Sequence, residues 1–151
     1  MIAIVDYGVG NLFSLRSSLA KLGLEAAVTA DPGVIRKADR LILPGVGAFA
    51  DAMAKLEATG LVPVLQEEAK TKPLLGICLG MQLLFERSYE YGTHAGLGLI
   101  PGEVCPLEPD LTDKSLKVPQ IGWNALHIVR EDPLFRYIQE GEYVYYVHSY
   151  Y

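Results

Sequence analysis

One stretch constrains the fold of this 151-residue chain most: Gly76–Gly80, which reads Gly-Ile-Cys-Leu-Gly. The apolar run before it, Pro73–Leu75, predicts a buried strand, and Leu83–Glu86 after it predicts a helix. A nucleophilic side chain between two glycines at a strand–helix junction is the pattern of a nucleophile elbow. Because such a turn is tight, we expect a side chain at Gly76 or Gly80 to collide with the neighbouring strand or helix.

The cysteine in the middle of this stretch, Cys78, has competing interpretations. Most free cysteines are buried and inert, and a lone Cys78 would be interpreted that way. The start of the following helix, however, favours the thiolate over the thiol. The strand, both glycines and the helix together favour a nucleophile. A non-catalytic, redox-sensing thiol on the same topology is the alternative.

The first half of the chain alternates apolar strands with amphipathic helices. Strands are predicted over 1–6, 24–29 and 41–43, with a turn at Asp31–Gly33. One helix begins after Asn11, a good N-cap, and ends at Gly23. Further helices are predicted over 49–60 and 61–70. This order predicts an α/β fold with a largely parallel sheet. The apolar face of the first helix comprises Leu12, Leu15, Leu19 and Leu22.

Beyond about residue 90 the pattern changes to short strands. Alternating segments over 102–107, 116–119 and 123–128 predict antiparallel strands added to the parallel core. Asp132 is expected to cap a short helix, and 142–147 predicts a strong strand.

Composition limits the classes of function. Hydrophobic residues make up 50% and charged residues 21%, which suits one globular domain. The net charge of −5, without a basic stripe, argues against nucleic acid as a partner. No apolar run reaches membrane-spanning length, and the start of the chain lacks a signal-peptide pattern, so we expect a cytoplasmic protein. Two cysteines, Cys78 and Cys105, make no disulfide framework, and no metal site is supported.

Two glycine-rich loops follow strands. Gly8 and Gly10 match the first two glycines of the Gly-x-Gly-x-x-Gly dinucleotide-binding motif. Phe13 stands where that motif needs its third glycine, so we reject a dinucleotide site. The loop Pro44–Gly47 leaves a strand at its carboxyl end, as the elbow does, and its uncovered N–H groups can approach a developing oxyanion. The N–H of Leu79, just after the nucleophile, is the expected second donor.

A cysteine nucleophile needs a general base, and three histidines are candidates. His94 lies in a glycine-rich segment and His127 in an alternating strand, so both have ordinary structural interpretations. His148 sits at the carboxyl end of a strand, which is more suggestive. No His–acid pair stands out from the spacing.

Five segments together carry a resemblance to a known family. The motif Gly-x-Cys-x-Gly-x-Gln at 76–82 is similar to the nucleophile motif of class I (triad) glutamine amidotransferases. With it, the segments 6–11, 43–49, 117–124 and 147–150 resemble, in order along the whole chain, the glutaminase subunits of imidazole glycerol phosphate synthases. This resemblance implies a flavodoxin-like, three-layer class I glutamine amidotransferase fold and a role in histidine biosynthesis.

The resemblance also implies roles for single residues. Cys78 would attack the side-chain amide of L-glutamine to form a thioester, with the N–H groups of Gly47 and Leu79 as oxyanion donors. No cofactor is implied. The residues expected to bind glutamine are Gly45, Val46, Gln82, Ser149 and Tyr150.

A partner is implied as well. Ammonia would pass to a (β/α)8-barrel cyclase subunit, and the isolated glutaminase would be a poor enzyme because its oxyanion loop needs that partner. Trp123 suits an interface anchor and, about equally, a core aromatic residue. The residues expected to face the cyclase are Tyr7, Asn11, Gln120, Trp123 and Asn124.

The sequence departs from the family at one place. The catalytic His and Glu of these enzymes lie in a His-x-Glu motif downstream of the His-Ser-Tyr segment, which is His148–Tyr150 here. We therefore expect 1–151 to be a single amidotransferase domain that lacks its C-terminal part. Without an imidazole the thiol ionises less readily, so we expect this fragment alone to be inactive.

Overall fold

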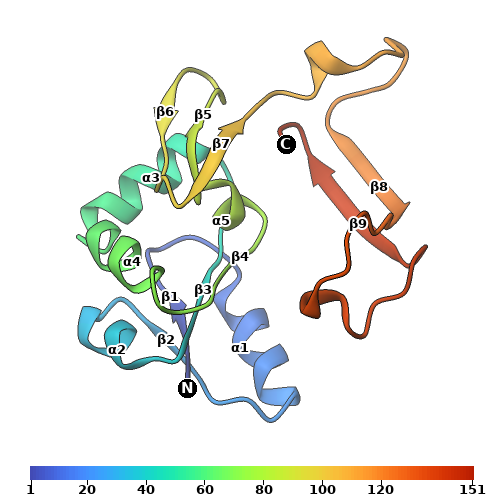
Figure 1. Cartoon of the computed structure of the whole chain (residues 1–151). Helices are drawn as coiled ribbons and strands as arrows, with labels where there is room; N and C mark the ends of the chain where they lie inside the picture. The colour runs from blue at the N-terminus through green and yellow to red at the C-terminus, as the bar shows by residue number, and fades with distance from the viewer. The chain divides into compact units, whose positions relative to one another are not determined.

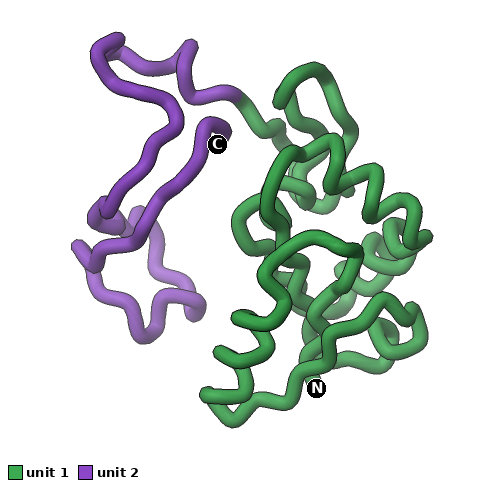
Figure 2. The backbone as a smooth tube through the Cα atoms, turned by 180° about the vertical axis from the view of Figure 1, so that it is seen from behind, with its two compact units in different colours: residues 1–105 green, residues 106–151 purple.

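The computed structural model describes residues 1–151 (Figure 1). Its contacts divide the chain into two compact units, Met1–Cys105 and Pro106–Tyr151, which Figure 2 colours separately. That the two units form a single domain remains a prediction. No helix combines the length and apolar character needed to cross a membrane.

Unit 1 is built on a four-stranded parallel sheet, which confirms the predicted α/β fold. The strand order is β2-β1-β3-β4, so β1 and β3 are the inner strands. In the register of the sheet, Ile4 of β1 lies opposite Val28 on one side and Ile42 on the other. The strands are β1 (Ile2–Val5), β2 (Ala26–Thr29), β3 (Arg40–Leu43) and β4 (Leu74–Gly76).

Helices cover both faces of this sheet (Figure 1). On one face, Ile4 and its neighbours pack against the apolar stripe of α1, from Leu12 to Leu19. On the other face, Val5 and Leu43 join a larger core with side chains of α2, α3 and α4. Three layers result, as the family resemblance implies. These helices are α1 (Leu12–Lys21), α2 (Pro32–Lys37), α3 (Phe49–Ala58) and α4 (Val62–Glu68).

The ends of α1 and α2 agree with the sequence prediction at Asn11 and differ from it at Leu22 and Asp31. Asn11 caps α1 as predicted, because its Oδ1 accepts a hydrogen bond from the Ser14 N–H at 3.1 Å. Leu22 was expected on the apolar face, but it forms the C-cap and its side chain is 72% exposed. The turn predicted at Asp31–Gly33 is instead the start of α2, with Asp31 as its N-cap.

Two predictions around the elbow are wrong. The helix expected over Leu83–Glu86 is confined to α5 (Leu79–Gln82), and β5 (Phe85–Ser88) follows it. Backbone bonds from a distant segment explain this, since Leu97 N–H donates to the Leu83 carbonyl at 2.8 Å and Leu99 N–H to the Leu84 carbonyl at 2.8 Å. The strand before the elbow, β4, is an edge strand with Leu75 45% exposed, not a buried one.

A small three-stranded sheet completes unit 1. Its order is β6-β5-β7, with β6 over His94–Ala95 and β7 over Ile100–Val104. The pair β5–β6 is antiparallel, but β5–β7 is parallel, so the expectation of an antiparallel strand over 102–107 is wrong for the pairing of β7.

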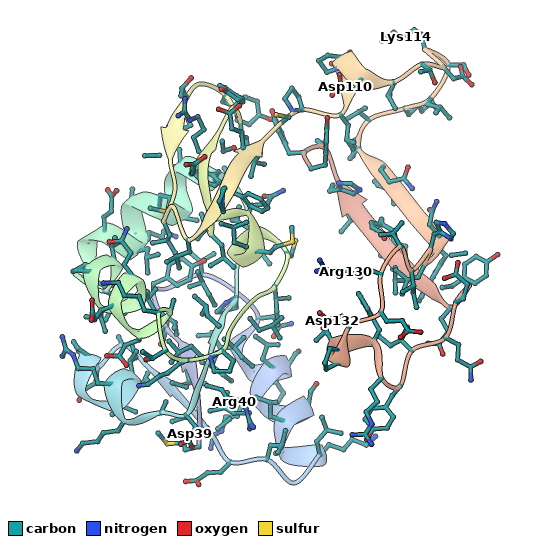
Figure 3. All side chains as sticks on the ribbon, in the orientation of Figure 1. Asp39, Arg40, Asp110, Lys114, Arg130 and Asp132 are labelled. Carbon is teal, nitrogen blue, oxygen red and sulfur yellow. The ribbon has the colours of Figure 1, made fainter.

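Unit 2 is an antiparallel hairpin of β8 (Gln120–Ala125) and β9 (Tyr143–His148), with two short 3-10 helices. The helix η2 (Pro133–Phe135) starts at Asp132, which caps it as predicted (Figure 3). The other helix, η1, spans Glu108–Asp110. The strand predicted over 116–119 does not form, and the one predicted over 123–128 lies at 120–125 instead.

Candidate active site

The predicted nucleophile, Cys78, occupies a strained backbone position at the start of α5. Its φ is 54° and its ψ is −119°, and only one other non-glycine residue, Tyr91, has a positive φ. Such a conformation is costly for a residue with a side chain, and it persists only where the surrounding structure enforces it. The residue is exposed, so its thiol is available to a substrate.

The glycines on either side of Cys78 explain how the strain is enforced. A Cβ on Gly76 would lie 2.4 Å from the Met81 Cα, and a Cβ on Gly80 would lie 1.9 Å from the Leu43 carbonyl oxygen. Both distances are far shorter than any contact that a real Cβ atom makes. The collisions predicted from the sequence are confirmed, and the elbow packs directly on the end of β3.

The loop after β3 packs on the elbow. A Cβ on Gly45 would lie 2.5 Å from the Gly80 nitrogen and 2.9 Å from the Leu79 Cβ. The Ile77 N–H also donates to the Leu43 carbonyl at 3.0 Å, which joins the ends of β4 and β3. The two loops singled out in the sequence therefore meet at the carboxyl edge of the sheet, where ligands gather in such folds.

Two of the backbone amides singled out in the sequence, one beside Cys78 and one in the loop after β3, have no acceptor within the chain. Neither the Gly47 N–H nor the Leu79 N–H donates a hydrogen bond to another group of residues 1–151. Gly47 has a φ of +96°, a conformation that glycine adopts without penalty. Free donors are what oxyanion stabilisation requires, and their catalytic role remains a prediction.

Tyr7 braces the beginning of the loop. Its side chain is 4% exposed, and its hydroxyl donates to the Pro44 carbonyl at 2.6 Å. Burial raises the pKa of Tyr7 to about 12. Gly10 adds to this support, because a Cβ there would lie 2.8 Å from the Pro44 Cβ. A contact between Tyr7 and a partner remains a prediction, and little of the Tyr7 side chain is exposed to make it. Asn11, four residues later, is exposed.

The end of the loop is held by a residue that the sequence did not reveal. Glu90 Oε2 accepts a hydrogen bond from the Phe49 N–H, the first amide of α3, at 2.6 Å. The N-cap of this helix, Ala48, has no side chain that could do so. That missing cap was the only sequence signal, and it does not indicate which distant carboxylate takes its place.

Two of the three candidate bases, both in unit 2, have structural partners of their own. His127 Nδ1 pairs with Glu140 Oε1 at 2.6 Å. Hydrogen bonds to the Glu140 carboxylate, first from the Ile128 N–H and then from His127, lower the pKa of Glu140. His148 Nδ1 donates to the Tyr150 carbonyl at 2.8 Å. His94 lies on β6 of unit 1. No three or more His, Cys, Asp or Glu residues gather where they could hold a metal ion.

Unit 2 carries most of the residues expected at a partner. Gln120 and Asn124 are joined by a side-chain hydrogen bond of 2.8 Å. Trp123 is 66% exposed and meets the Tyr145 ring edge to face at 5.5 Å, so it is not a core aromatic residue.

The residues expected to hold glutamine divide between the two units. Gly45, Val46 and Gln82 belong to unit 1, where Val46 is 57% exposed and Gln82 is half-buried. In unit 2 the Ser149 carbonyl accepts from the Leu107 N–H at 2.9 Å, and Tyr150 forms a bridge with Pro106. Their substrate contacts remain predictions.

Comparison with known proteins defines the class. The glutamine amidotransferase class-I family matches residues 3–151, and the chain belongs to this family. A crystal structure of a glutamine amidotransferase shares the fold, with a TM-score of 0.60 at 20% identity, over 70% of this chain and 57% of that one.

Closer relatives are imidazole glycerol phosphate synthase subunits HisH. The chain is 50% identical to that of Wolinella succinogenes over 151 residues, covering 99% of this chain and 74% of the relative. It is 51% identical to that of Sulfurimonas denitrificans, covering 99% and 72%. The identity to the Bacillus cytotoxicus protein is 53%, covering 100% and 70%.

Proposed function

We propose that this chain is the glutamine-hydrolysing subunit of an imidazole glycerol phosphate synthase, acting in histidine biosynthesis. The observation that carries the proposal is the exposed thiol of Cys78, presented at a positive φ beside a loop whose Gly45 packs on the elbow. The HisH relatives, about half identical over the whole chain, support the assignment to this particular synthase.

The chemistry is acyl transfer through a thioester. The Cys78 sulfur attacks the side-chain amide carbon of glutamine, and the carbonyl oxygen becomes an oxyanion facing the N–H groups of Gly47 and Leu79. The C–N bond then breaks, and the nitrogen leaves as ammonia after taking up a proton. Water attacks the thioester, which releases glutamate and restores the thiol.

The ammonia is consumed by a second subunit. We propose a (β/α)8-barrel cyclase as this partner, which receives ammonia without its release to solvent. Trp123, with its large exposed ring, is the proposed anchor of the contact. Asn11, Gln120 and Asn124 are exposed or half-buried and are proposed to lie at the same interface, together with the segment around Tyr7.

Covalent labelling tests this proposal. The complete protein, in complex with its cyclase, is treated with a glutamine analogue that alkylates thiols, and the modified peptide is identified by mass spectrometry. We expect labelling at Cys78 alone, prevented by excess glutamine, while Cys105 stays unmodified. Labelling of Cys78 that is equal with and without glutamine would instead support the redox-sensing thiol, which its exposure also allows.

A further inference from the structure

We infer that Glu90 is a positioning residue for the loop 44–48, because its carboxylate fixes the peptide at which this loop becomes α3. The inference rests on the proposed function in one respect, which is that Gly47 in this loop supplies an oxyanion donor. Glu90 itself would act through the backbone of Phe49 and touch no reacting atom.

The contact with Phe49 has the character of a strong hydrogen bond. The Phe49 N–H and the Glu90 Oε2 are 2.6 Å apart in a partly buried setting, at the short end of the range for N–H···O bonds. The first N–H groups of a helix have no partner within the helix. Since Ala48 offers no cap, removing the carboxylate leaves this amide without its acceptor.

Glu90 is itself held in place by its neighbours. Its N–H donates to the hydroxyl of Ser88 at 3.2 Å, and Ser88 is 0% exposed. The Tyr89 N–H donates to the Val104 carbonyl at 3.0 Å, which ties the same segment to β7. The carboxylate therefore projects from a fixed backbone, and its position can be transmitted to α3.

The loop is held by a hydrogen bond at each end, and between them Gly45 packs on the elbow. Tyr7 holds the Pro44 carbonyl at one end, and Glu90 holds the Phe49 amide at the other. The Gly47 N–H between these anchors has no acceptor in the chain. The direction of that N–H consequently depends on how firmly the ends are fixed. The Glu90 Oε2 is the acceptor in its bond with Phe49, so its role there is to hold the amide and not to supply a proton.

The expected kinetic effect follows from the stage of the reaction at which the Gly47 N–H contacts the oxyanion. An oxyanion exists only at the transition state and in the tetrahedral intermediate, so a displaced donor lowers kcat and leaves the KM for glutamine nearly unchanged. Complete loss of one oxyanion donor costs about 10²–10³-fold in kcat. For a displaced rather than deleted donor, we expect a loss of about 10–100-fold.

Three variants of the complete glutaminase–cyclase complex test this inference. Glu90→Ala should lower kcat by about 10–100-fold, with KM within about threefold of the unmodified enzyme. Glu90→Gln retains an oxygen that can accept from Phe49, so most of the activity should return. The matched control is Glu86→Ala, because Glu86 also accepts from a backbone amide, that of Gly102 at 3.0 Å, outside this loop. The control should keep normal kcat.

Two further readouts separate a positioning role from a folding defect. The ammonia-dependent reaction of the same complexes should be unchanged, which reports an intact assembly. Hydrogen exchange should show faster exchange at the Phe49 amide in Glu90→Ala, with the Leu56 amide of α3 still protected. This exchange result does not depend on glutaminase activity, whereas absence of glutamine-dependent activity in the unmodified complex would refute the proposed function instead.

Three outcomes would overturn the inference. The first is normal kcat in Glu90→Ala. The second is a rise in KM alone, which would place Glu90 in contact with glutamine. The third is a Glu90→Gln variant as impaired as Glu90→Ala, which would mean that the charge and not the hydrogen bond matters.

Discussion

The backbones of Gly45 and Gly80 lie in direct contact, and a Cβ on Gly45 would come within 2.5 Å of the Gly80 nitrogen. This contact joins the loop after β3 to the elbow after β4. Because neither position has room for a side chain, the proposed oxyanion loop and the nucleophile are held together by main-chain packing. The arrangement of the candidate site is thus a consequence of where the glycines stand in the sequence.

Substitution of Gly80 tests this packing. Gly80→Ala would place a methyl group 1.9 Å from the Leu43 carbonyl oxygen, and backbone atoms cannot move aside cheaply. We expect the free energy of unfolding to fall by about 3–5 kcal/mol, measured by urea denaturation, or the protein not to fold.

Gly60→Ala is the matched control. Gly60 has a φ of +70° but no atom within 4 Å of the added methyl group. An alanine at this position is strained only by the left-handed backbone conformation, so we expect the free energy of unfolding to fall by about 1–2 kcal/mol. The φ of Gly80 is not positive, so a loss at Gly80 no larger than the loss at Gly60 would contradict the close packing of Gly80 on β3.

The raised pKa of Tyr7 predicts a change of stability at high pH. Burial favours the neutral phenol and raises its pKa from 10.0 to about 12, so its contribution is complete below pH 10 and is lost as pH rises to 12. The difference in unfolding free energy between the unmodified protein and Tyr7→Phe should therefore shrink by about 2 kcal/mol across this range. Urea denaturation at several pH values measures it, and a constant difference would contradict the burial of this hydroxyl.

Trp123 provides a test of the proposed interface. Since its side chain is 66% exposed, Trp123→Ala should change the free energy of unfolding by less than about 0.5 kcal/mol. Binding to the cyclase should weaken by about 2 kcal/mol, or roughly 30-fold in Kd, as titration calorimetry would measure.

Tyr137→Ala serves as its control, because Tyr137 is 87% exposed and has no proposed place in the interface. It should bind the cyclase normally. Equal weakening by both variants, or none by Trp123→Ala, would remove Trp123 from the interface.

Local signals in the sequence predicted much of unit 1. The apolar run of β1, the cap at Asn11 and the glycines around Cys78 act within a few residues, and the structure has each of them where expected. Elements whose backbone partners lie nearby in sequence, or whose side chains fit only one conformation, can be predicted this way.

What could not be predicted depends on contacts between distant residues. Leu83 and Leu84 look helical in sequence, but their carbonyls accept from Leu97 and Leu99, which stops the helix. The bond between Phe49 and Glu90 spans 41 residues, and that between Tyr7 and Pro44 spans 37. No periodic pattern in the sequence indicates such pairs, so the two hydrogen bonds that hold the loop 44–48 could be found only in the structure.

The central claim is that Cys78 liberates ammonia from glutamine for use by the cyclase, and one assay with two nitrogen sources tests it directly. The rate of imidazole glycerol phosphate formation is measured for the complete complex and its Cys78→Ala variant, with glutamine or with an ammonium salt. We predict that the variant loses at least about 10⁴-fold of the glutamine-dependent rate and keeps the ammonia-dependent rate, because only the thioester step needs the thiol. A variant that retains glutamine-dependent synthesis would contradict the account.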